Sequence, residues 1–224
     1  MVSAIVVAGG RGKRMGTVQS KQYLNLNGKP ILYYTIKSFL NCKLVDNIIL
    51  VVPFHEIDYC KNEILNKNFI KVNKIIAGGS ERYESVYNGL MAAEGSDIVL
   101  IHDGVRPFVS EKLINDSIMY AKRYGAAAPG VMPKDTIKVI DKNRFSIQTP
   151  NRSELVSVQT PQAFRYDLIY ECHKKIKNED VEITDDTMVA EYFGNNVYIY
   201  EGEYSNIKIT TPEDLIIGEY LANK

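Results

Sequence analysis

The sequence lacks any run of about 18 apolar residues, the length that a membrane-spanning helix needs, so no such helix is predicted. Its first residues, Met1 to Ala8, are apolar but too few for the core of a signal peptide, and the basic residues follow them instead of preceding them. Cysteine is scarce: Cys42, Cys60 and Cys172 have neither zinc-site nor redox spacing. These absences predict a cytoplasmic protein whose cysteines serve as small buried apolar side chains.

The formal net charge is zero, because 27 basic residues balance 27 acidic ones. This balance argues against nucleic acid as a partner. The charges are unevenly placed, since no Asp or Glu precedes Asp46. Among the basic residues before that position, Lys37 and Lys43 are expected on solvated helix faces. The cluster from Arg11 to Lys21 falls in a glycine-rich turn instead and predicts a local anion site.

The composition that remains is ordinary for a globular enzyme. Hydrophobic residues make up 45% and charged residues 24%, which excludes a disordered or collagen-like chain. The 224 residues suit one α/β domain spanning 1–224. A chain of this length buries roughly 70% of its unfolded surface on folding, so it needs no metal or disulfide to hold a core. The sequence contains no internal repeat and no interdomain linker.

Short apolar runs alternate with longer amphipathic stretches along the chain. This pattern predicts an α/β fold with a Rossmann-like, mostly parallel sheet and helices on both faces. Strands are expected over Ser3–Ala8, Ile48–Val52, Val72–Ala77, Ile98–His102, Ala126–Met132 and Val197–Tyr200. Helices are expected over Pro30–Leu40, Glu56–Leu65, Glu81–Ala93, Glu111–Tyr124 and from Thr211, an N-cap followed by Pro212, to the carboxyl terminus.

One segment, about 136–159, breaks this alternation. It contains two pieces with period-two patterning, Thr136–Ile140 and Phe145–Thr149, separated by a turn at Asp141–Asn143. We interpret it as a β-arm that projects from the main sheet. Such an arm either covers an active site or supplies an edge for dimerisation, and the sequence leaves both possibilities open.

A glycine-rich turn, Ala8 to Gly16, follows the first predicted strand directly. Ligands collect at the carboxyl ends of strands in open α/β sheets, and glycines let backbone N–H groups approach phosphate oxygens. The turn is not a Walker loop, because Arg14 stands where Ser or Thr is required, nor a dinucleotide fingerprint, because Met15 replaces the last glycine. Arg14 and Lys21 beside it predict phosphoryl or nucleotidyl transfer, whose transition state needs fixed cations. The alternative is a turn with solvated basic residues.

Polar residues also follow other predicted strands. Asp103 follows the strand Ile98–His102 at the same sheet edge, where it could meet a phosphate-bound metal or pair with Arg106 to shape the loop; we favour a combined role. No nucleophile motif accompanies the histidines, which we interpret as structural: His55, His102 and His173.

The turn Gly78 to Arg82, with Ser85 one helical turn later, could contact a base or ribose through its backbone. The alternative is an ordinary N-cap by Ser80. Other segment ends also carry polar groups that on their own would be loop chemistry: Lys134–Thr136, Asn151–Arg152, Gln159–Gln162 and Asn206–Thr210.

Taken together, these stretches resemble the 2-C-methyl-D-erythritol 4-phosphate cytidylyltransferase family, which acts in non-mevalonate isoprenoid synthesis. The resemblance runs in order over essentially the whole chain. The glycine turn and Gly28-Lys29-Pro30 are shared widely among nucleotidyltransferases. More specific are Lys21-Gln22-Tyr23, His102-Asp103 with Arg106-Pro107, Gln159-Thr160-Pro161-Gln162 and Asn206-Ile207-Lys208-Ile209-Thr210.

The resemblance implies a role for each matching residue. Arg14 and Lys21 would stabilise the transition state at the α-phosphate of CTP, and Asp103 would lie near a Mg²⁺ ion held mainly by the triphosphate. The nucleotide would be held by Ala8, Gly9, Gly10, Gly79, Ser80 and Ser85. The sugar phosphate would be contacted or positioned by Asp103, Arg106, Thr136, Arg152, Thr160 and Lys208, with Arg152 and Lys208 counted as catalytic. The family also implies a homodimer in which the arm supplies Thr136 and Arg152 to the partner's site.

The sequence departs from the family pattern at two positions. Ser20 stands where Pro is usual before the Lys-Gln pair, and Gly104 replaces the usual Ala. Both changes bear on loop rigidity more than on chemistry. A related alternative is ribitol-5-phosphate cytidylyltransferase, although Thr160–Phe164 and Thr184–Asp186 look more like the methylerythritol enzyme. An alternative of another class is a catalytically silent nucleotide-binding regulator on the same fold.

Overall fold

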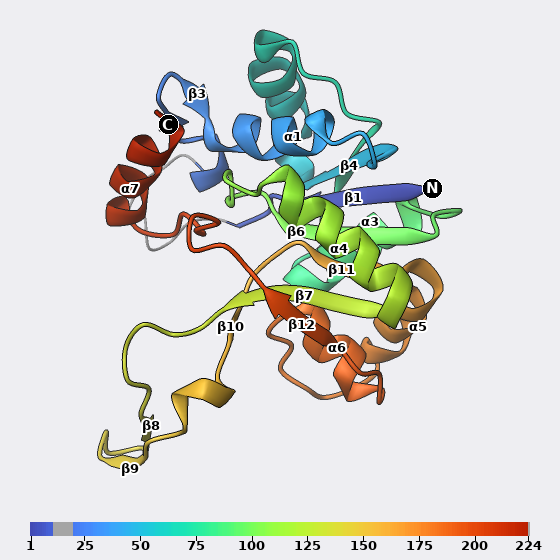
Figure 1. Ribbon diagram of the computed structural model, residues 1–224. Helices are drawn as coiled ribbons and strands as arrows, with labels where there is room; N and C mark the ends of the chain where they lie inside the picture. Colours follow the sequence, from blue (N-terminus) through green and yellow to red (C-terminus); the bar gives the residue numbers. More distant parts are fainter. Residues whose placement is uncertain (11–19, 224) are drawn as a thin grey trace.

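The structure is a computed structural model that describes residues 1–10 and 20–223. An eight-stranded sheet runs through its centre in the order β10–β7–β11–β6–β1–β4–β5, with β12 paired to β7 (Figure 1). Two strands, β10 and β11, are antiparallel to their neighbours. The others run parallel, which confirms the predicted α/β class: β1 (Val2–Val7), β4 (Asn47–Val52), β5 (Lys74–Ala77), β6 (Ile98–Asp103), β7 (Ala126–Val131) and β12 (Tyr198–Glu201).

The central strands send alternate side chains into two apolar layers, one on each face of the sheet. In β1, Ala4 and Val6 pack in the layer that contains α1 (Ile31–Asn41) and α4 (Glu111–Tyr124). Ile5 packs in the opposite layer, against α3 (Arg82–Ala92), α5 (Tyr166–Ile176) and α6 (Asp186–Tyr192). Burial on both faces explains why these strands are continuous apolar runs in the sequence.

The predicted helices are present, with differences at their ends. α4 has the predicted bounds and ends before Gly125, whose φ of +90° suits glycine. α3 is capped by Glu81, not by Ser80, through a capping box with Glu84. The region expected as one helix over Glu56–Leu65 is irregular: α2 (Ile57–Tyr59) continues as a π-helix over Cys60–Leu65 and a 3-10 turn over Asn66–Asn68.

The carboxyl-terminal helix, α7 (Pro212–Ala222), begins where the sequence predicts. Thr211 caps it, and the Asp214 carboxylate accepts from the backbone N–H groups of Thr210 and Thr211 at 2.8 and 2.9 Å. α7 packs on a small hairpin of β2 (Asn25–Leu26) and β3 (Lys29–Pro30). Asn27 and Gly28 form its turn with φ of +49° and +83°, so the glycine of the Gly-Lys-Pro stretch has a structural reason.

Elements between residues 157 and 192 were not foreseen. β11 (Gln162–Arg165) inserts antiparallel between β6 and β7, and α5 and α6 follow it. Its polar ends give neither an apolar run nor a strict alternation, so periodicity could not reveal it. β10 (Ser157–Val158) pairs with β7, which corrects the expected boundary of the arm: these two residues belong to the main sheet.

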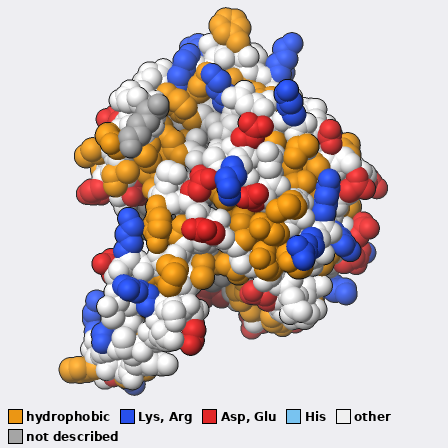
Figure 2. Space-filling view, in the orientation of Figure 1, with side chains coloured by type: hydrophobic (Ala, Val, Ile, Leu, Met, Phe, Trp, Pro, Cys, Tyr) orange, Lys and Arg blue, Asp and Glu red, His pale blue; other side chains and the backbone are white. Residues whose placement is uncertain are grey.

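The β-arm projects away from the body (Figures 1 and 2). Its strands, β8 (Val139–Ile140) and β9 (Ser146–Gln148), are shorter than expected but antiparallel as predicted. Asp141 organises the turn, because its carboxylate accepts from the backbone N–H groups of Asn143 and Phe145, both at 2.9 Å. Phe145 and Ile147 are 71% and 65% exposed, so the arm carries apolar side chains without covering them.

Within the described residues, no helix combines the length and the apolar character that crossing a bilayer requires.

Candidate active site

A pocket of about 630 Å³ opens at the carboxyl edge of the sheet, where β1 and β6 pair. The strand order switches at this point, because β4, the next strand of the sheet along the chain, pairs with one edge of β1, and the later strand β6 pairs with its other edge. Ligands of open α/β sheets bind at such switches in strand order. All six residues predicted to bind the nucleotide line this pocket: Ala8, Gly9, Gly10, Gly79, Ser80 and Ser85. The charged residues Lys21, Asp103 and Lys208 line it too.

The glycine turn leaves β1 at the floor of the pocket. A Cβ atom built on Gly9 would meet nothing within 4 Å, so this position opens toward the pocket. A Cβ atom built on Gly10 would lie 3.3 Å from Cε of Lys21, which places the lysine side chain across this glycine. Arg14, predicted to act with Lys21, lies outside the described residues. The described part of the turn therefore combines exposed backbone with one ammonium group.

The second glycine turn, before α3, is held by side chains of the helix. Ser85 Oγ accepts from the backbone N–H of Gly79 at 3.1 Å. Glu84 accepts from the Ser80 hydroxyl and the Ser80 backbone N–H, both at 2.7 Å. Hydrogen bonds from Ser80 and from the backbone N–H of Glu81 lower the pKa of Glu84. The turn is thus fixed before any ligand arrives and presents small residues to the pocket.

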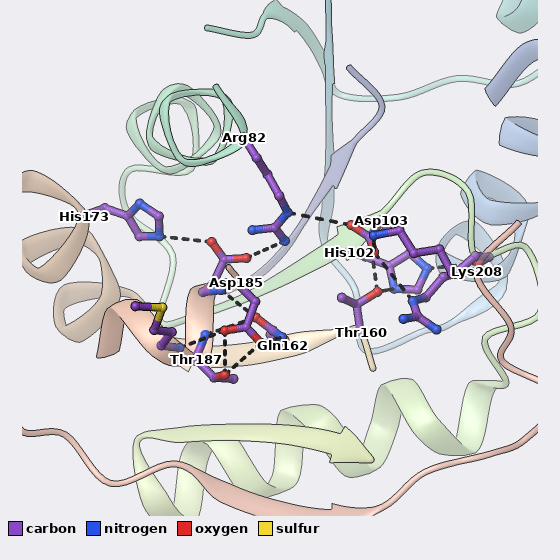
Figure 3. Close-up of polar contacts among 12 residues, drawn as sticks. Arg82, His102, Asp103, Thr160, Gln162, His173, Asp185, Thr187 and Lys208 are labelled. Atoms are coloured by element: carbon purple, nitrogen blue, oxygen red, sulfur yellow. Dashed lines mark hydrogen bonds and ion pairs between the residues drawn. The ribbon is translucent and has the colours of Figure 1, made fainter. Parts of the chain in front are cut away.

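The opposite side of the pocket is charged. Asp103 ends β6, and its Oδ2 lies 2.9 Å from Nζ of Lys208 and 3.6 Å from Nε of Arg106. Its Oδ1 lies 3.9 Å from Nε of Arg82 (Figure 3). Burial would raise the pKa of Asp103, but Lys208, Arg82 and Arg106 outweigh it and hold that pKa well below its usual range. Three cations face two carboxylates here, Asp103 and Asp186, which lies 2.7 Å from Arg82, so an excess of positive charge remains and favours an anionic ligand.

His102 and Thr160 support Asp103 from beneath the pocket. Thr160 Oγ1 accepts from the Asp103 backbone N–H at 3.2 Å and lies 3.0 Å from His102 Nδ1, while His102 Nε2 lies 3.0 Å from the carbonyl oxygen of Arg106. A carbonyl only accepts, so Nε2 carries the proton and the Thr160 hydroxyl donates to Nδ1. Burial lowers the pKa of His102 to about 4, which keeps the ring neutral. The structural role predicted for His102 fits this arrangement.

Sequence reasoning missed a buried network behind the charged side. Asp186, at the start of α6, is fully buried and lies 2.7 Å from Nη2 of Arg82 and 3.1 Å from Nε2 of His173. Burial would raise the pKa of Asp186, but Arg82 and His173 outweigh it and lower that pKa. Arg82 therefore bridges two carboxylates, Asp186 and Asp103, and lines the pocket. In the sequence, the hint of this network was Arg82, the charged residue at the end of the Gly78–Arg82 turn.

The Gln162 side chain fixes the start of α6 and so the place of Asp186. Its Oε1 accepts from the backbone N–H groups of Asp186 and Thr187 at 2.9 and 3.2 Å, and its Nε2 donates to Asp185 at 2.8 Å (Figure 3). Thr160 and Gln162 thus support Asp103 by two routes, through its backbone and through Arg82. This gives the Thr160-Pro161-Gln162 motif a structural explanation.

Four residues predicted to meet the sugar phosphate are not among those lining the pocket. Thr160 lies below it, and Arg106 is mostly buried, with its Nη1 donating to the carbonyl oxygen of Asn206 at 2.8 Å. Thr136 and Arg152 are exposed near the arm, where Arg152 Nη1 donates to the carbonyl oxygen of Lys134 at 3.1 Å. The structure does not bring these two residues to the pocket of their own chain.

The other two histidines differ in setting. His173 is fully buried against Asp186, as a structural residue would be. His55, also predicted to be structural, is exposed at the pocket border, with Nε2 3.9 Å from Glu56.

The described residues contain no group of three or more His, Cys, Asp or Glu side chains that could hold a metal ion by themselves. Asp103 is the carboxylate that both lines the pocket and ends a central strand. Mg²⁺ is commonly bound through one or two carboxylates together with substrate phosphates. Asp103 is therefore the carboxylate of the pocket that could meet a cation carried by substrate phosphates, although Lys208, Arg106 and Arg82 already surround it.

Comparisons with known proteins show the family to which the chain is similar. The sequence model of 2-C-methyl-D-erythritol 4-phosphate cytidylyltransferase matches residues 2–224. A protein of that name from Clostridium botulinum (strain Eklund 17B) is 82% identical over 224 residues, 100% of both chains. One from Clostridium beijerinckii is 67% identical over 220 residues, 98% of this chain and 97% of that one.

Solved structures show the same likeness. The 4-diphosphocytidyl-2C-methyl-D-erythritol synthase from Anaerococcus prevotii superposes with a TM-score of 0.86 at 36% identity, covering 100% of this chain and 96% of that one. The cytidylyltransferase from Thermus thermophilus superposes with a TM-score of 0.79 at 28% identity, covering 98% of each chain. The chain therefore belongs to the 2-C-methyl-D-erythritol 4-phosphate cytidylyltransferase family.

Proposed function

We propose that this chain catalyses the reaction that the family's name describes, transfer of the cytidylyl group of CTP to 2-C-methyl-D-erythritol 4-phosphate. The observation that carries the proposal is the composition of the pocket. Its side with the two glycine turns suits a nucleoside triphosphate, because exposed backbone can approach phosphates closely. Its other side carries the positive charge that an anionic acceptor requires, because Arg82 and Arg106 add to the Lys208–Asp103 pair.

In the proposed step, an oxygen of the acceptor phosphate attacks the α-phosphorus of CTP. A new P–O bond forms, the bond to the β-phosphate oxygen breaks, and pyrophosphate leaves with the electron pair. The acceptor phosphate is anionic at neutral pH, so no general base is required. His102 would be a poor base in any case, because it is buried and its pKa is lowered to about 4.

The two lysines of the pocket have different tasks in this proposal. Lys21 lies across Gly10 and, together with Arg14, would stabilise the charge that develops on the α-phosphate in the transition state. Lys208 would hold the acceptor phosphate, which is charged before and during the reaction. Asp103 orients Lys208 through their 2.9 Å ion pair. Arg106 donates a hydrogen bond to the backbone carbonyl oxygen of Asn206, two residues before Lys208. This bond helps to position Lys208.

Members of this family use a divalent cation, and we propose that this chain uses Mg²⁺. Asp103 would hold it together with the triphosphate. The ion would neutralise negative charge on the phosphates. Nucleotide and acceptor would still be positioned by the chain's own residues.

We further propose a cytoplasmic homodimer formed through the β-arm. Three free, buried cysteines suit a reducing compartment. The exposed Phe145 and Ile147 and the short strand edges of the arm need covering, which a second copy would supply. Thr136 and Arg152 would then complete the partner's acceptor site. Deleting residues 141–148 should weaken dimerisation and raise the acceptor KM more than the CTP KM; a fully active monomer in sedimentation would contradict this.

The reaction is tested by pyrophosphate release from CTP with each acceptor in a separate assay. We expect turnover with 2-C-methyl-D-erythritol 4-phosphate and at least roughly 10-fold lower kcat/KM with ribitol 5-phosphate, because the latter has a longer chain and lacks the branching methyl group, and a one-carbon difference is worth roughly 10- to 200-fold. The likeness of Thr184–Asp186 to the methylerythritol enzyme favours this order. A preference for ribitol 5-phosphate would instead indicate that the chain is a ribitol-5-phosphate cytidylyltransferase. CTP binding without turnover of either acceptor would indicate a silent regulator.

A further inference from the structure

A carboxylate with no role assigned so far, Glu56, contacts both neighbours of Lys21. Glu56 ends a 3-10 turn, Phe54–Glu56, that follows β4, and its backbone N–H donates to the carbonyl oxygen of Pro53 at 2.8 Å. Its Oε1 accepts from Ser20 Oγ at 2.5 Å, and its Oε2 accepts from Gln22 Nε2 at 3.2 Å. One side chain, anchored at the end of a central strand, therefore holds the residues on either side of Lys21.

A carboxylate matches this contact without any rearrangement of its partners. Both partners donate, the hydroxyl of Ser20 and the amide nitrogen of Gln22. A carboxylate offers two acceptor oxygens, whereas an amide would present a donor to one of the partners. The Glu56 side chain is 15% exposed and Gln22 is buried, so the bonds are largely shielded from competing water. Hydrogen bonds to an ionised acceptor are also stronger than neutral ones.

Holding both neighbours restricts Lys21 itself, because the segment is one short turn. Lys21–Tyr23 forms a 3-10 turn in which the Tyr23 N–H donates to the Ser20 carbonyl at 2.9 Å and the Leu24 N–H donates to the Lys21 carbonyl at 3.2 Å. Tyr23 is buried, which fixes the far end of the turn. The place of the Lys21 backbone decides where the ammonium can lie beside Gly10.

We propose that Glu56 is a positioning residue for Lys21: it holds Ser20 and Gln22 so that the ammonium is in place when charge develops on the α-phosphate. Glu56 is not among the residues that line the pocket, so it acts through Lys21 and not by touching the substrates. This inference rests on the proposed role of Lys21. Misplacing a catalytic group by about 1 Å can cost on the order of 100-fold in rate, and we expect Glu56→Ala to lower kcat by roughly 10-fold.

The first test compares Glu56→Ala with Asp58→Ala, which removes an exposed acid two residues further along. We measure kcat, the Kd of CTP by calorimetry and the melting temperature of each variant. Glu56→Ala should lower kcat while the CTP Kd changes by less than roughly threefold, and Asp58→Ala should change neither. An unchanged kcat, or a loss explained by weaker CTP binding, would overturn the proposal. If Glu56→Ala does not fold, Glu56→Gln serves, with a smaller expected loss of kcat.

A rescue variant separates positioning from a general loss of structure. Ser20 has φ −59° and ψ 131°, a conformation that proline adopts. Ser20→Pro in the Glu56→Ala background should therefore restore stiffness before Lys21 and bring kcat back to within roughly threefold of the unmodified enzyme. A double variant that stays as slow as Glu56→Ala would count against positioning through the segment.

A double-mutant cycle with Lys21→Ala then identifies the route. If Glu56 acts through Lys21, adding Glu56→Ala to Lys21→Ala should lower kcat no further, whereas independent effects would multiply. Multiplying effects overturn the proposal and leave the proposed reaction standing. A Lys21→Ala variant that keeps full kcat would instead remove the transition-state role of Lys21, and this inference with it.

Discussion

The two sides of the pocket differ in the kinds of residue that form them. The nucleotide side consists of backbone and small side chains, and Glu84 and Ser85 hold its second turn; its residues are Ala8, Gly9, Gly10, Gly79, Ser80 and Ser85. The charged side, Arg82, Asp103 and Lys208, consists of ion pairs that Arg106 and Asp186 support from behind. The first is defined by shape and the second by charge. Substitutions should therefore act sterically on one side and electrostatically on the other.

The largest effect should come from the lysine that stands at the border of the nucleotide side. Lys21→Ala should lower kcat by roughly 10² or more with little change in CTP affinity, because the charge it meets develops only in the transition state. Steady-state kinetics with each substrate varied in turn measures this. A variant in which only the CTP KM rises would assign Lys21 to ground-state binding instead.

Lys208→Ala should have the next largest effect, and on the other substrate. We expect the acceptor KM to rise by roughly 10-fold and kcat to fall as well, since the attacking phosphate loses a fixed partner and its geometry loosens. Lys208→Arg should not recover fully, because a planar guanidinium does not replace a compact ammonium beside Asp103. Equal changes in both KM values would erase the distinction between the two sides.

Glycine substitutions should alter the nucleotide side of the pocket through shape alone. A Cβ on Gly79 would lie 2.3 Å from the Glu84 Cβ, so Gly79→Ala should shift the turn, lower the melting temperature and raise the CTP KM by roughly 10-fold. Gly9→Ala meets nothing within 4 Å and should leave stability unchanged. A rise in the CTP KM for Gly9→Ala would then report direct approach of the nucleotide. If both variants bind CTP normally, the nucleotide does not contact this side.

His102, beneath the charged side, should affect stability and its pH dependence more than turnover. Its pKa is lowered from 6.5 to about 4, so its contribution is complete above pH 6.5 and is lost as the pH falls toward 4, because the unfolded chain takes up the proton first. The shift corresponds to about 3 kcal/mol in full and about 2 kcal/mol by pH 5. Urea unfolding of the unmodified enzyme and His102→Asn at pH 7.5 and 5 measures it. Identical pH dependence in both would contradict the burial of a neutral ring.

Much of the fold could be predicted because its signals are local. Strands buried on both faces are continuous apolar runs, and Thr211-Pro212 marks a helix start by itself. β11 could not be predicted in this way. Its four residues include Gln162 and Arg165, and it is a strand because β6 and β7 flank it.

The site residues likewise fall into those with a local signal in the sequence and those whose contacts depend on the packed fold. The glycine turns, Lys21, Asp103 and Lys208 follow strands or match motifs, and the structure brings them to one pocket. The Arg82–Asp186 pair joins the starts of two helices far apart in the chain, and only the packed fold shows that contact. Thr160 belongs to a matching motif as well, but its hydroxyl is hydrogen-bonded to the Asp103 backbone and to His102. Thr160 therefore supports Asp103 and does not face the pocket.

Two proposals remain to be tested together: the nucleotide and the acceptor bind on different sides of the pocket, and Lys21 acts only in the transition state. The most direct test is calorimetric titration of 2-C-methyl-D-erythritol 4-phosphate into enzyme saturated with a CTP analogue whose α and β phosphorus atoms are joined by CH₂, so that no transfer occurs. We predict equal acceptor affinity in the unmodified enzyme and Lys21→Ala, and at least roughly 10-fold weaker binding in Lys208→Ala. Unchanged binding in Lys208→Ala, or a loss confined to Lys21→Ala, would contradict these proposals.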